Sequence, residues 1–212
     1  HRLILPDLRS SGRSHCSGPL SWDRLADDIA QLMDHLGLSQ TIVGGASGGT
    51  GAALRLALRH PDRVSALLLV APLYGGHGLA LNKTQRAAFA AMAQAGERCL
   101  EEGISALEPL FAHLPEPIRG AALEMIQSFD AASVAATTRL FASAAMPFGG
   151  AEELARVEAP TLLVPGADAM HPPETAELYA EALANVTVQE VANLMSEELA
   201  GTIARFCSAV AR

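Results

Sequence analysis

The residue with the clearest chemical potential is Ser47, which lies in the glycine-rich segment VGGASGG. Gly45, Ser47 and Gly49 form the pattern G-x-S-x-G, which is typical of a strand that turns sharply into a helix and exposes the serine. A serine hydroxyl is a weak nucleophile, so such a site needs a base and hydrogen-bond donors for the oxyanion. In this interpretation Ser47 is the nucleophile, and the backbone N–H of Gly48 is one oxyanion donor.

Two other interpretations of the same segment stay open when it is considered alone. A dinucleotide-binding loop is one, with Ala46 in place of its middle glycine, but that motif needs an acid at the end of the following strand. Asp62 has a suitable spacing but precedes that strand, and Thr50 stands where a phosphate-binding loop would carry lysine. The second interpretation is a glycine-rich turn in which the serine has no chemical role.

The elements around Ser47 predict an α/β fold with a mostly parallel sheet and helices on both faces. Short, uniformly apolar runs predict buried strands, because parallel sheets are covered on both faces. The predicted strands are RLILPDL, QTIVG, SALLLVAP, APTLLVPG and VTVQEV, and the predicted helices between them are SWDRLADDIAQLMDHLGLS, GGTGAALRLALRH, PPETAELYAEALA and SEELAGTIARFCSAVA. Alternation of strands and helices implies right-handed crossovers.

The middle of the chain has a different texture. From Asn82 to Met146 it is rich in alanine and helical in pattern, with no convincing strand. The sequence therefore predicts an α/β core formed by residues 1–76 and 151–212, interrupted by a helical insertion at residues 77–150.

Several segments together resemble the α/β-hydrolase superfamily. RLILPDLRSSGRS is similar to its D-x-R-G-x-G-x-S loop, matched here by Asp7, Arg9, Gly12 and Ser14, with Ser10 replacing the first glycine. LADDIAQLMDHLGL, ALRHPDRVSALLLVAP and APTLLVPGADAMHPPE resemble the helix before the serine turn, the elements after it, and the later strand with its acid loop. The similarity runs from the start to about residue 72 and again from about residue 154.

The resemblance implies roles for particular residues. Ser47 would be the nucleophile, Gly48 an oxyanion donor, and Asp168 the acid that orients a histidine base. Residues 77–150 would correspond to the variable helical cap. The family's earlier strands and the loop with its second oxyanion donor have no counterpart here, so the sequence is expected to be truncated at the N-terminus.

The histidine is missing from its expected place. The family carries it between the last strand and the last helix, where this chain reads VANLMSEELA. Two of the seven histidines, His171 and His77, are candidates to replace it, because each follows a predicted strand. His171 has the better location, although its closeness to Asp168 in sequence makes a Ser–His–Asp line awkward. The other histidines are interpreted as residues without a catalytic role.

Composition narrows the classes of partner. Half of the 212 residues are hydrophobic, the net charge is −8, and no basic run exists, so nucleic acid is not an expected partner. The apolar runs are too short to cross a membrane. The three cysteines form no metal-binding pattern, so no metal or cofactor is expected, and reduced thiols favour a cytoplasmic location. A homo-oligomer is compatible with the sequence.

Two functions remain as hypotheses. The first is a serine hydrolase that acts on a small ester or other acyl substrate through an acyl-enzyme on Ser47, with an apolar group in the substrate. The second is a catalytically impaired relative that serves as a small-ligand binding or interaction protein, because the expected histidine is absent.

Overall fold

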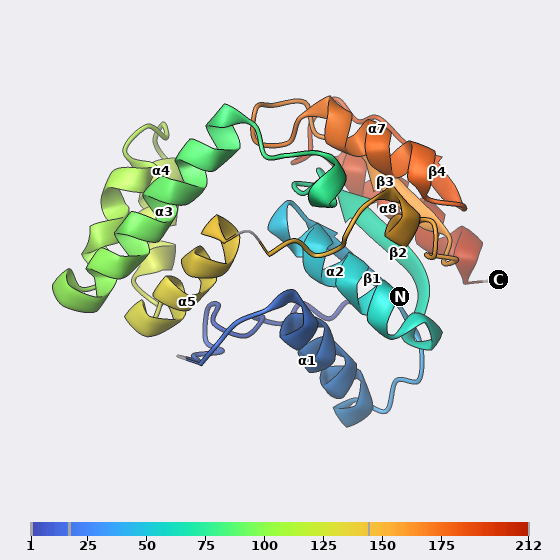
Figure 1. Cartoon of the computed structure of the whole chain (residues 1–212), viewed down its shortest axis with the longest axis horizontal. Coiled ribbons are helices and arrows are strands. Elements are labelled where there is room, and N and C mark those ends of the chain that lie inside the picture. Colours follow the sequence, from blue (N-terminus) through green and yellow to red (C-terminus); the bar gives the residue numbers. More distant parts are fainter. Residues whose placement is uncertain (1, 17, 144, 212) are drawn as a thin grey trace. The chain divides into compact units, whose positions relative to one another are not determined.

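The computed structural model describes residues 2–16, 18–143 and 145–211 (Figure 1). The chain forms two compact units. One consists of His1–Ser21 and Lys83–Ala145, and the other of Trp22–Asn82 and Met146–Arg212. The predicted core and insertion bounds differ from this division chiefly at the start of the chain, because the first 21 residues group with the inserted helices.

The second unit contains a four-stranded parallel sheet, in the order β1-β2-β3-β4 (Figure 1). Its strands are β1 (Thr41–Ala46), β2 (Val64–Val70), β3 (Thr161–Val164) and β4 (Val186–Val188). Its helices are α1 (Trp22–His35), α2 (Gly48–Arg59), α6 (Ala151–Leu154), α7 (Pro173–Ala182) and α8 (Glu197–Val210), with short 3-10 turns η1 (Pro61–Arg63) and η2 (Gly76–Gly78). The predicted α/β class with a parallel sheet is confirmed.

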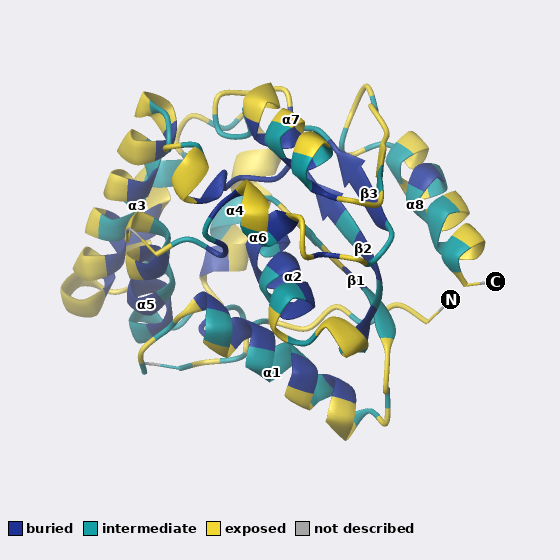
Figure 2. Cartoon of the chain, turned by 45° about the vertical axis from the view of Figure 1, so that its right-hand side comes forward, coloured by how far each residue is buried: buried dark blue, intermediate teal, exposed yellow. Residues whose placement is uncertain are grey.

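Helices cover both faces of this sheet, which explains why its central strands are apolar throughout. Leu67 and Leu69 of β2 pack into one cluster with α1, α2 and α7, whereas Val70 packs on the other face against α8. Figure 2 shows the buried strands β2 and β3 between these two layers. Because successive side chains of a strand point to opposite faces, both sets must be apolar here.

The other unit is helical. It contains α3 (Lys83–Glu102), η3 (Ile104–Phe111), α4 (Ile118–Ile126) and α5 (Ala131–Ala142), packed around a small apolar cluster that includes Cys99 and Ile126. The described residues of this unit contain no strand, as the sequence predicts for residues 82–146. None of the helices in the described ranges is both long and apolar enough to cross a bilayer.

The predicted strand at the start of the chain is wrong. The described residues before the first turn form no strand, and the side chains of Leu3 and Leu5 are 79% and 82% exposed. An extended apolar segment becomes a strand only when a neighbour accepts its backbone hydrogen bonds, and within the described chain none does so.

The turn from β1 into α2 depends on one close backbone approach. A Cβ atom at Gly45 would lie 2.2 Å from the carbonyl oxygen of Gly49, and backbone atoms cannot move aside cheaply. A Cβ at Gly49 would meet no atom within 4 Å. The sequence pattern treats both glycines alike, but only Gly45 is required by packing.

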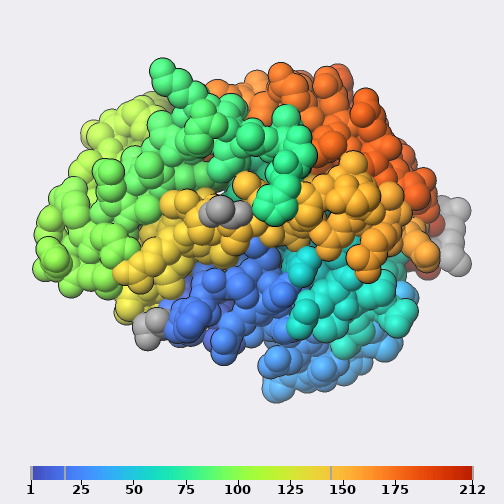
Figure 3. All heavy atoms as spheres, viewed as in Figure 1, coloured from blue at the N-terminus to red at the C-terminus, as the bar shows by residue number. Residues whose placement is uncertain are grey.

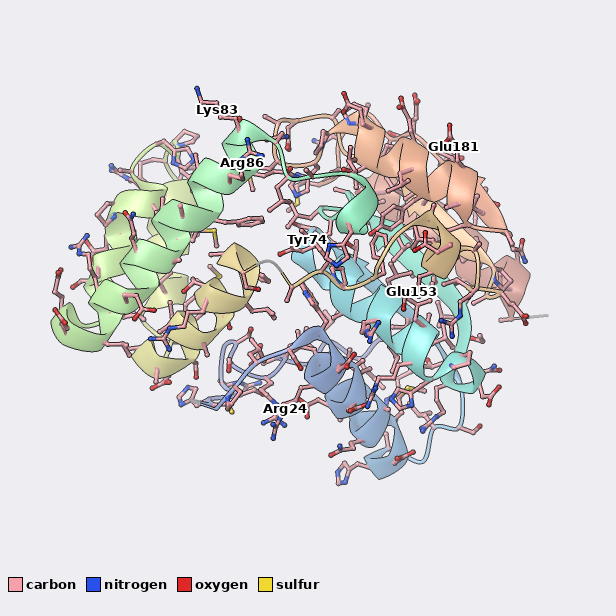
Figure 4. All side chains as sticks on the ribbon, viewed as in Figure 1. Arg24, Tyr74, Lys83, Arg86, Glu153 and Glu181 are labelled. Carbon is pink, nitrogen blue, oxygen red and sulfur yellow. The ribbon has the colours of Figure 1, made fainter. Side chains whose placement is uncertain are left out.

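Helix α1 is held against α2 by ion pairs. Asp27 on α1 accepts hydrogen bonds from Arg59 at 2.6 Å and lies 2.7 Å from the ring of His60. Further along, Arg55 pairs with Glu153 of α6 at 3.2 Å, and Glu153 also accepts a hydrogen bond from the backbone N–H of Gly149. Figure 4 labels Glu153. Atoms of α1 and α2 adjoin on the visible face (Figure 3). These contacts fix α2, the helix that directly follows Ser47.

Gly45→Ala tests the close approach. We expect it to lower the free energy of unfolding by about 2 kcal/mol, because the added methyl group overpacks the turn. Gly49→Ala is the matched control and should change stability by no more than about 0.5 kcal/mol. Urea unfolding followed by circular dichroism measures both, and equal stability of the two variants would contradict the packing argument.

Asp27→Asn tests the helix contact. The hydrogen bond from Arg59, with a smaller one from His60, lowers the pKa of Asp27 to about 2. A lowered pKa stabilises the folded state above the ordinary value of 3.8, and this stabilisation is lost as pH falls through the folded value. Because the pair is partly exposed, we expect Asn to cost about 1 kcal/mol near neutral pH.

The pH dependence separates this ion pair from a loss of packing. The difference between wild type and Asp27→Asn, measured by urea unfolding, should shrink as pH falls below about 4 and approach zero near the lowered pKa. Asp62→Asn, at an exposed carboxylate on η1, should leave the stability unchanged at each pH. A difference independent of pH would reject the electrostatic explanation.

Candidate functional site

The candidate site lies at the carboxyl ends of three parallel strands, which meet at one edge of the sheet. Ser47 follows β1 directly, Ala71 follows β2, and the loop after β3 carries Asp168 and His171. All four residues belong to the same compact unit. Ligands of open parallel sheets bind at this edge, so the location agrees with a functional site.

Ser47 is held in a strained conformation by its surroundings. Its φ of 51° and ψ of −122° lie in the left-handed half of the map, which a residue with a side chain rarely adopts. Its N–H donates to the carbonyl of Val70 at 2.9 Å, and its carbonyl accepts from the N–H of Thr50 at 3.1 Å. The sheet and the helix thus fix the backbone, and the partly exposed residue remains accessible.

His171 lies beside this serine. Its Nε2 atom is 2.8 Å from the Oγ atom of Ser47, and its Nδ1 atom is 3.0 Å from Oδ1 of Asp168 and 3.2 Å from Oδ2. The histidine side chain is 19% exposed, whereas that of Asp168 is 64% exposed. The three side chains therefore form a serine–histidine–aspartate line within hydrogen-bond reach.

Asp168 also organises the loop backbone. Its Oδ1 atom accepts hydrogen bonds from the N–H groups of Met170 and His171, each at 2.8 Å. The carboxylate therefore closes a local turn and contacts the imidazole at the same time. Partial burial raises the pKa of Asp168, but the hydrogen bonds from His171 and Met170 outweigh it and leave the pKa below its ordinary value. The group is therefore ionised at neutral pH.

The ionised carboxylate determines which nitrogen of His171 carries the proton. A carboxylate only accepts hydrogen bonds, so Nδ1 must donate to Asp168. In neutral imidazole the other nitrogen, Nε2, then presents a lone pair to the hydroxyl of Ser47. This arrangement is able to remove a proton from the serine.

Gly48 occupies the position that the sequence predicts for it. It is the first residue of α2, where backbone N–H groups have no acceptor within the helix. The positive end of the helix dipole lies there as well. The location suits a donor for negative charge that develops next to Ser47.

His77 is not brought to the serine. It is exposed on η2, and its backbone N–H donates to the carbonyl of Gly149 at 2.6 Å. His60 is engaged with Asp27 at the contact of α1 and α2, in agreement with its interpretation as a structural residue. Of the two substitutes considered from sequence, the structure brings only His171 to Ser47.

The loop after β4 caps α8 and packs against the sheet. Ser196 caps α8 by accepting the N–H of Leu199, and Asn193 accepts the N–H of Met195. Val191 and Leu194 pack against the cluster that contains Val70. The short spacing of Asp168 and His171 in the sequence makes a Ser–His–Asp line awkward to predict, and the structure accommodates it. The missed signal was the spacing Asp-x-x-His before two prolines.

The described residues contain no group of three or more histidine, cysteine or acidic side chains arranged to bind a metal ion. Asp168 and His171 make up a pair rather than such a cluster.

Comparison with known proteins points to one family. A family model described as "alpha/beta hydrolase fold" matches residues 1–108, slightly more than half of the chain. "Putative carbamate hydrolase RutD" of Caulobacter sp. (strain K31) is 44% identical over 71 residues, which cover 32% of this chain and 26% of that protein. In this match the chain therefore spans about a quarter of the length of the carbamate hydrolase. The protein of the same name from Azorhizobium caulinodans is 29% identical over 200 residues, covering 90% of this chain and 72% of its own.

Solved structures agree. A thermophilic esterase from Thermogutta terrifontis superposes with a TM-score of 0.78 at 25% identity, covering 97% of this chain and 79% of the esterase. An esterase from Exiguobacterium antarcticum has a TM-score of 0.70 at 17% identity, covering 93% and 76%, and supports the fold alone. The chain belongs to the α/β-hydrolase family.

Proposed function

We propose that this protein is a serine hydrolase that cleaves a small ester or other acyl substrate through an acyl-enzyme on Ser47. The observation that carries the proposal is the 2.8 Å separation of Ser47 Oγ and His171 Nε2, with Asp168 on the opposite side of the ring. This supplies the base whose absence from the loop after β4 favoured a binding protein.

In the first half of the proposed reaction, Ser47 Oγ attacks the carbonyl carbon of the substrate while its proton passes to His171 Nε2. Asp168 stabilises the imidazolium that forms. The oxyanion of the tetrahedral intermediate is stabilised by the N–H of Gly48. When the bond to the leaving group breaks, the leaving group takes the proton from Nε2.

In the second half, water attacks the acyl carbon and gives its proton to His171 Nε2. The intermediate collapses, the carboxylic acid leaves, and Ser47 regains its proton. Each turnover consumes one water molecule and uses no group beyond the chain's own residues. The names of the relatives include carbamate hydrolase, esterase and lipase, which supports an acyl-type substrate here.

The remaining features of the proposal come from the sequence. Residues 77–150 would serve as the cap of the hydrolase, and their alanine, leucine, methionine and phenylalanine content favours an apolar group in the substrate.

The contrasting function, a small-ligand binding protein without catalysis, differs from the hydrolase in one measurable property, the reactivity of Ser47.

Fluorophosphonate labelling measures that reactivity directly. Wild-type protein should label covalently, Ser47→Ala should not, and His171→Gln should label about 100-fold more slowly or worse, because the general base is lost. His77→Gln is the matched control and should label at the wild-type rate. Equal labelling of wild type and His171→Gln would reject His171 as the base, and no labelling of wild type would favour the binding protein.

The acid has a separate test. Asp168→Asn should slow labelling by about tenfold to 100-fold, less than loss of a buried acid, because water screens the exposed carboxylate. Glu174→Gln, at an exposed carboxylate in the first turn of α7, is the control and should have no effect. An unchanged rate for Asp168→Asn would show that the carboxylate serves the loop turn alone.

The pH profile should also assign the groups. Because the pKa of Asp168 is lowered, this carboxyl stays ionised as pH falls from about 8 to about 5, so a fall in the labelling rate over this interval does not come from Asp168. Labelling rates measured across that range should rise with pH and then level off. A flat profile would argue against any histidine base.

A further inference from the structure

The base and the acid of the proposed site come from one short loop, so something must set its distance from Ser47. The serine is fixed to the sheet through its hydrogen bond with Val70. The loop is partly exposed, and the amide of Asn82 donates to the carbonyl of Ala169 at 2.9 Å. These contacts leave open how closely His171 approaches the sheet.

Gly166 lies directly beneath His171. A Cβ atom at Gly166 would be 2.3 Å from Cβ of His171 and 2.8 Å from its carbonyl oxygen, far inside van der Waals contact. The φ angle of Gly166 is not among the positive values of the chain, so φ does not by itself require glycine at this position. Glycine is therefore required here chiefly by the closeness of His171.

Ala71 also lies close to this position of Gly166. Its Cβ atom is 3.3 Å from the same position, and Ala71 is buried at the end of β2. Its N–H donates to the carbonyl of Val164 at 2.7 Å, which ties it to β3. A side chain at position 166 would thus press on both Ala71, which is tied to the sheet, and the partly exposed loop, and the loop would yield.

We propose that Gly166 is a positioning residue that sets the distance between His171 and Ser47. The inference rests on the proposed function, in which His171 is the base. Any larger residue at position 166 lifts His171 away from Ser47, which the sheet holds in place. A displacement of about 1 Å at a reacting centre can cost about 100-fold in rate.

Gly166→Ala tests this role, with Gly78→Ala as the matched control, because a Cβ at Gly78 meets no atom within 4 Å. We expect fluorophosphonate labelling of Ser47 to slow about 100-fold in Gly166→Ala and to stay within about twofold of wild type in Gly78→Ala. Equal rates for the two variants, with wild-type labelling still dependent on His171, would overturn the inference and leave the hydrolase proposal intact.

A double-mutant cycle separates positioning from general damage. If Gly166 acts through His171, Gly166→Ala should cause little further loss in a His171→Gln background. A similar loss in both backgrounds would show a merely structural role and overturn the inference. If wild type does not label, or labels without need of His171, the proposed function fails and this inference fails with it.

A second-site change covers the case in which Gly166→Ala does not fold. Adding Ala71→Gly removes the methyl group on the sheet side and lets the new side chain settle there. The double variant should fold, as judged by circular dichroism, and should label at least about tenfold faster than Gly166→Ala alone. Failure of the pair to fold or to regain activity would reject the positioning role.

Discussion

The close approach of Gly45 to the first turn of α2 constrains the whole site. The backbone of Gly45 lies where no side chain fits beside the carbonyl of Gly49, so β1 passes into α2 with almost no connecting loop. Ser47 absorbs the reversal by adopting a positive φ. Its hydrogen bond to Val70 then ties the strained residue to the central strand. The nucleophile is therefore the fixed point, and the other groups must be brought to it.

Those other groups arrive on a single loop, which local interactions fold. Asp168 turns the chain by accepting two backbone N–H groups, and the residue before a proline is restricted to extended conformations, which limits His171 before Pro172. The short loop therefore aims the imidazole without help from a distant strand. The loop after β4, free of this task, caps α8 and packs against the sheet.

Much of this follows from the sequence, and the exceptions have a common cause. The four strands of the sheet and the helices between them are local patterns of hydrophobicity, and Ser47 and Asp168 are local motifs, so their placement could be predicted. The strand predicted around Leu3 needs a partner strand, which no local pattern reveals. The contact of His171 with Ser47 joins residues 124 positions apart. Glycine is needed at position 166 because His171 folds back onto it, which the local sequence does not show. Likewise, the open space at Gly49 depends on how α2 packs.

The shared loop has a mechanical consequence. When base and acid lie three residues apart and their contact is reinforced by backbone hydrogen bonds, movement of the loop carries both together. The Asp168–His171 bond then survives displacements that break the bond to Ser47. The weak point of this constellation is therefore the serine–histidine distance, and the residues that govern it are the small ones packed between loop and sheet. Ala71, itself at a positive φ, and Gly166 are such residues, so small side chains beneath the loop are as much a condition of the site as its three polar groups.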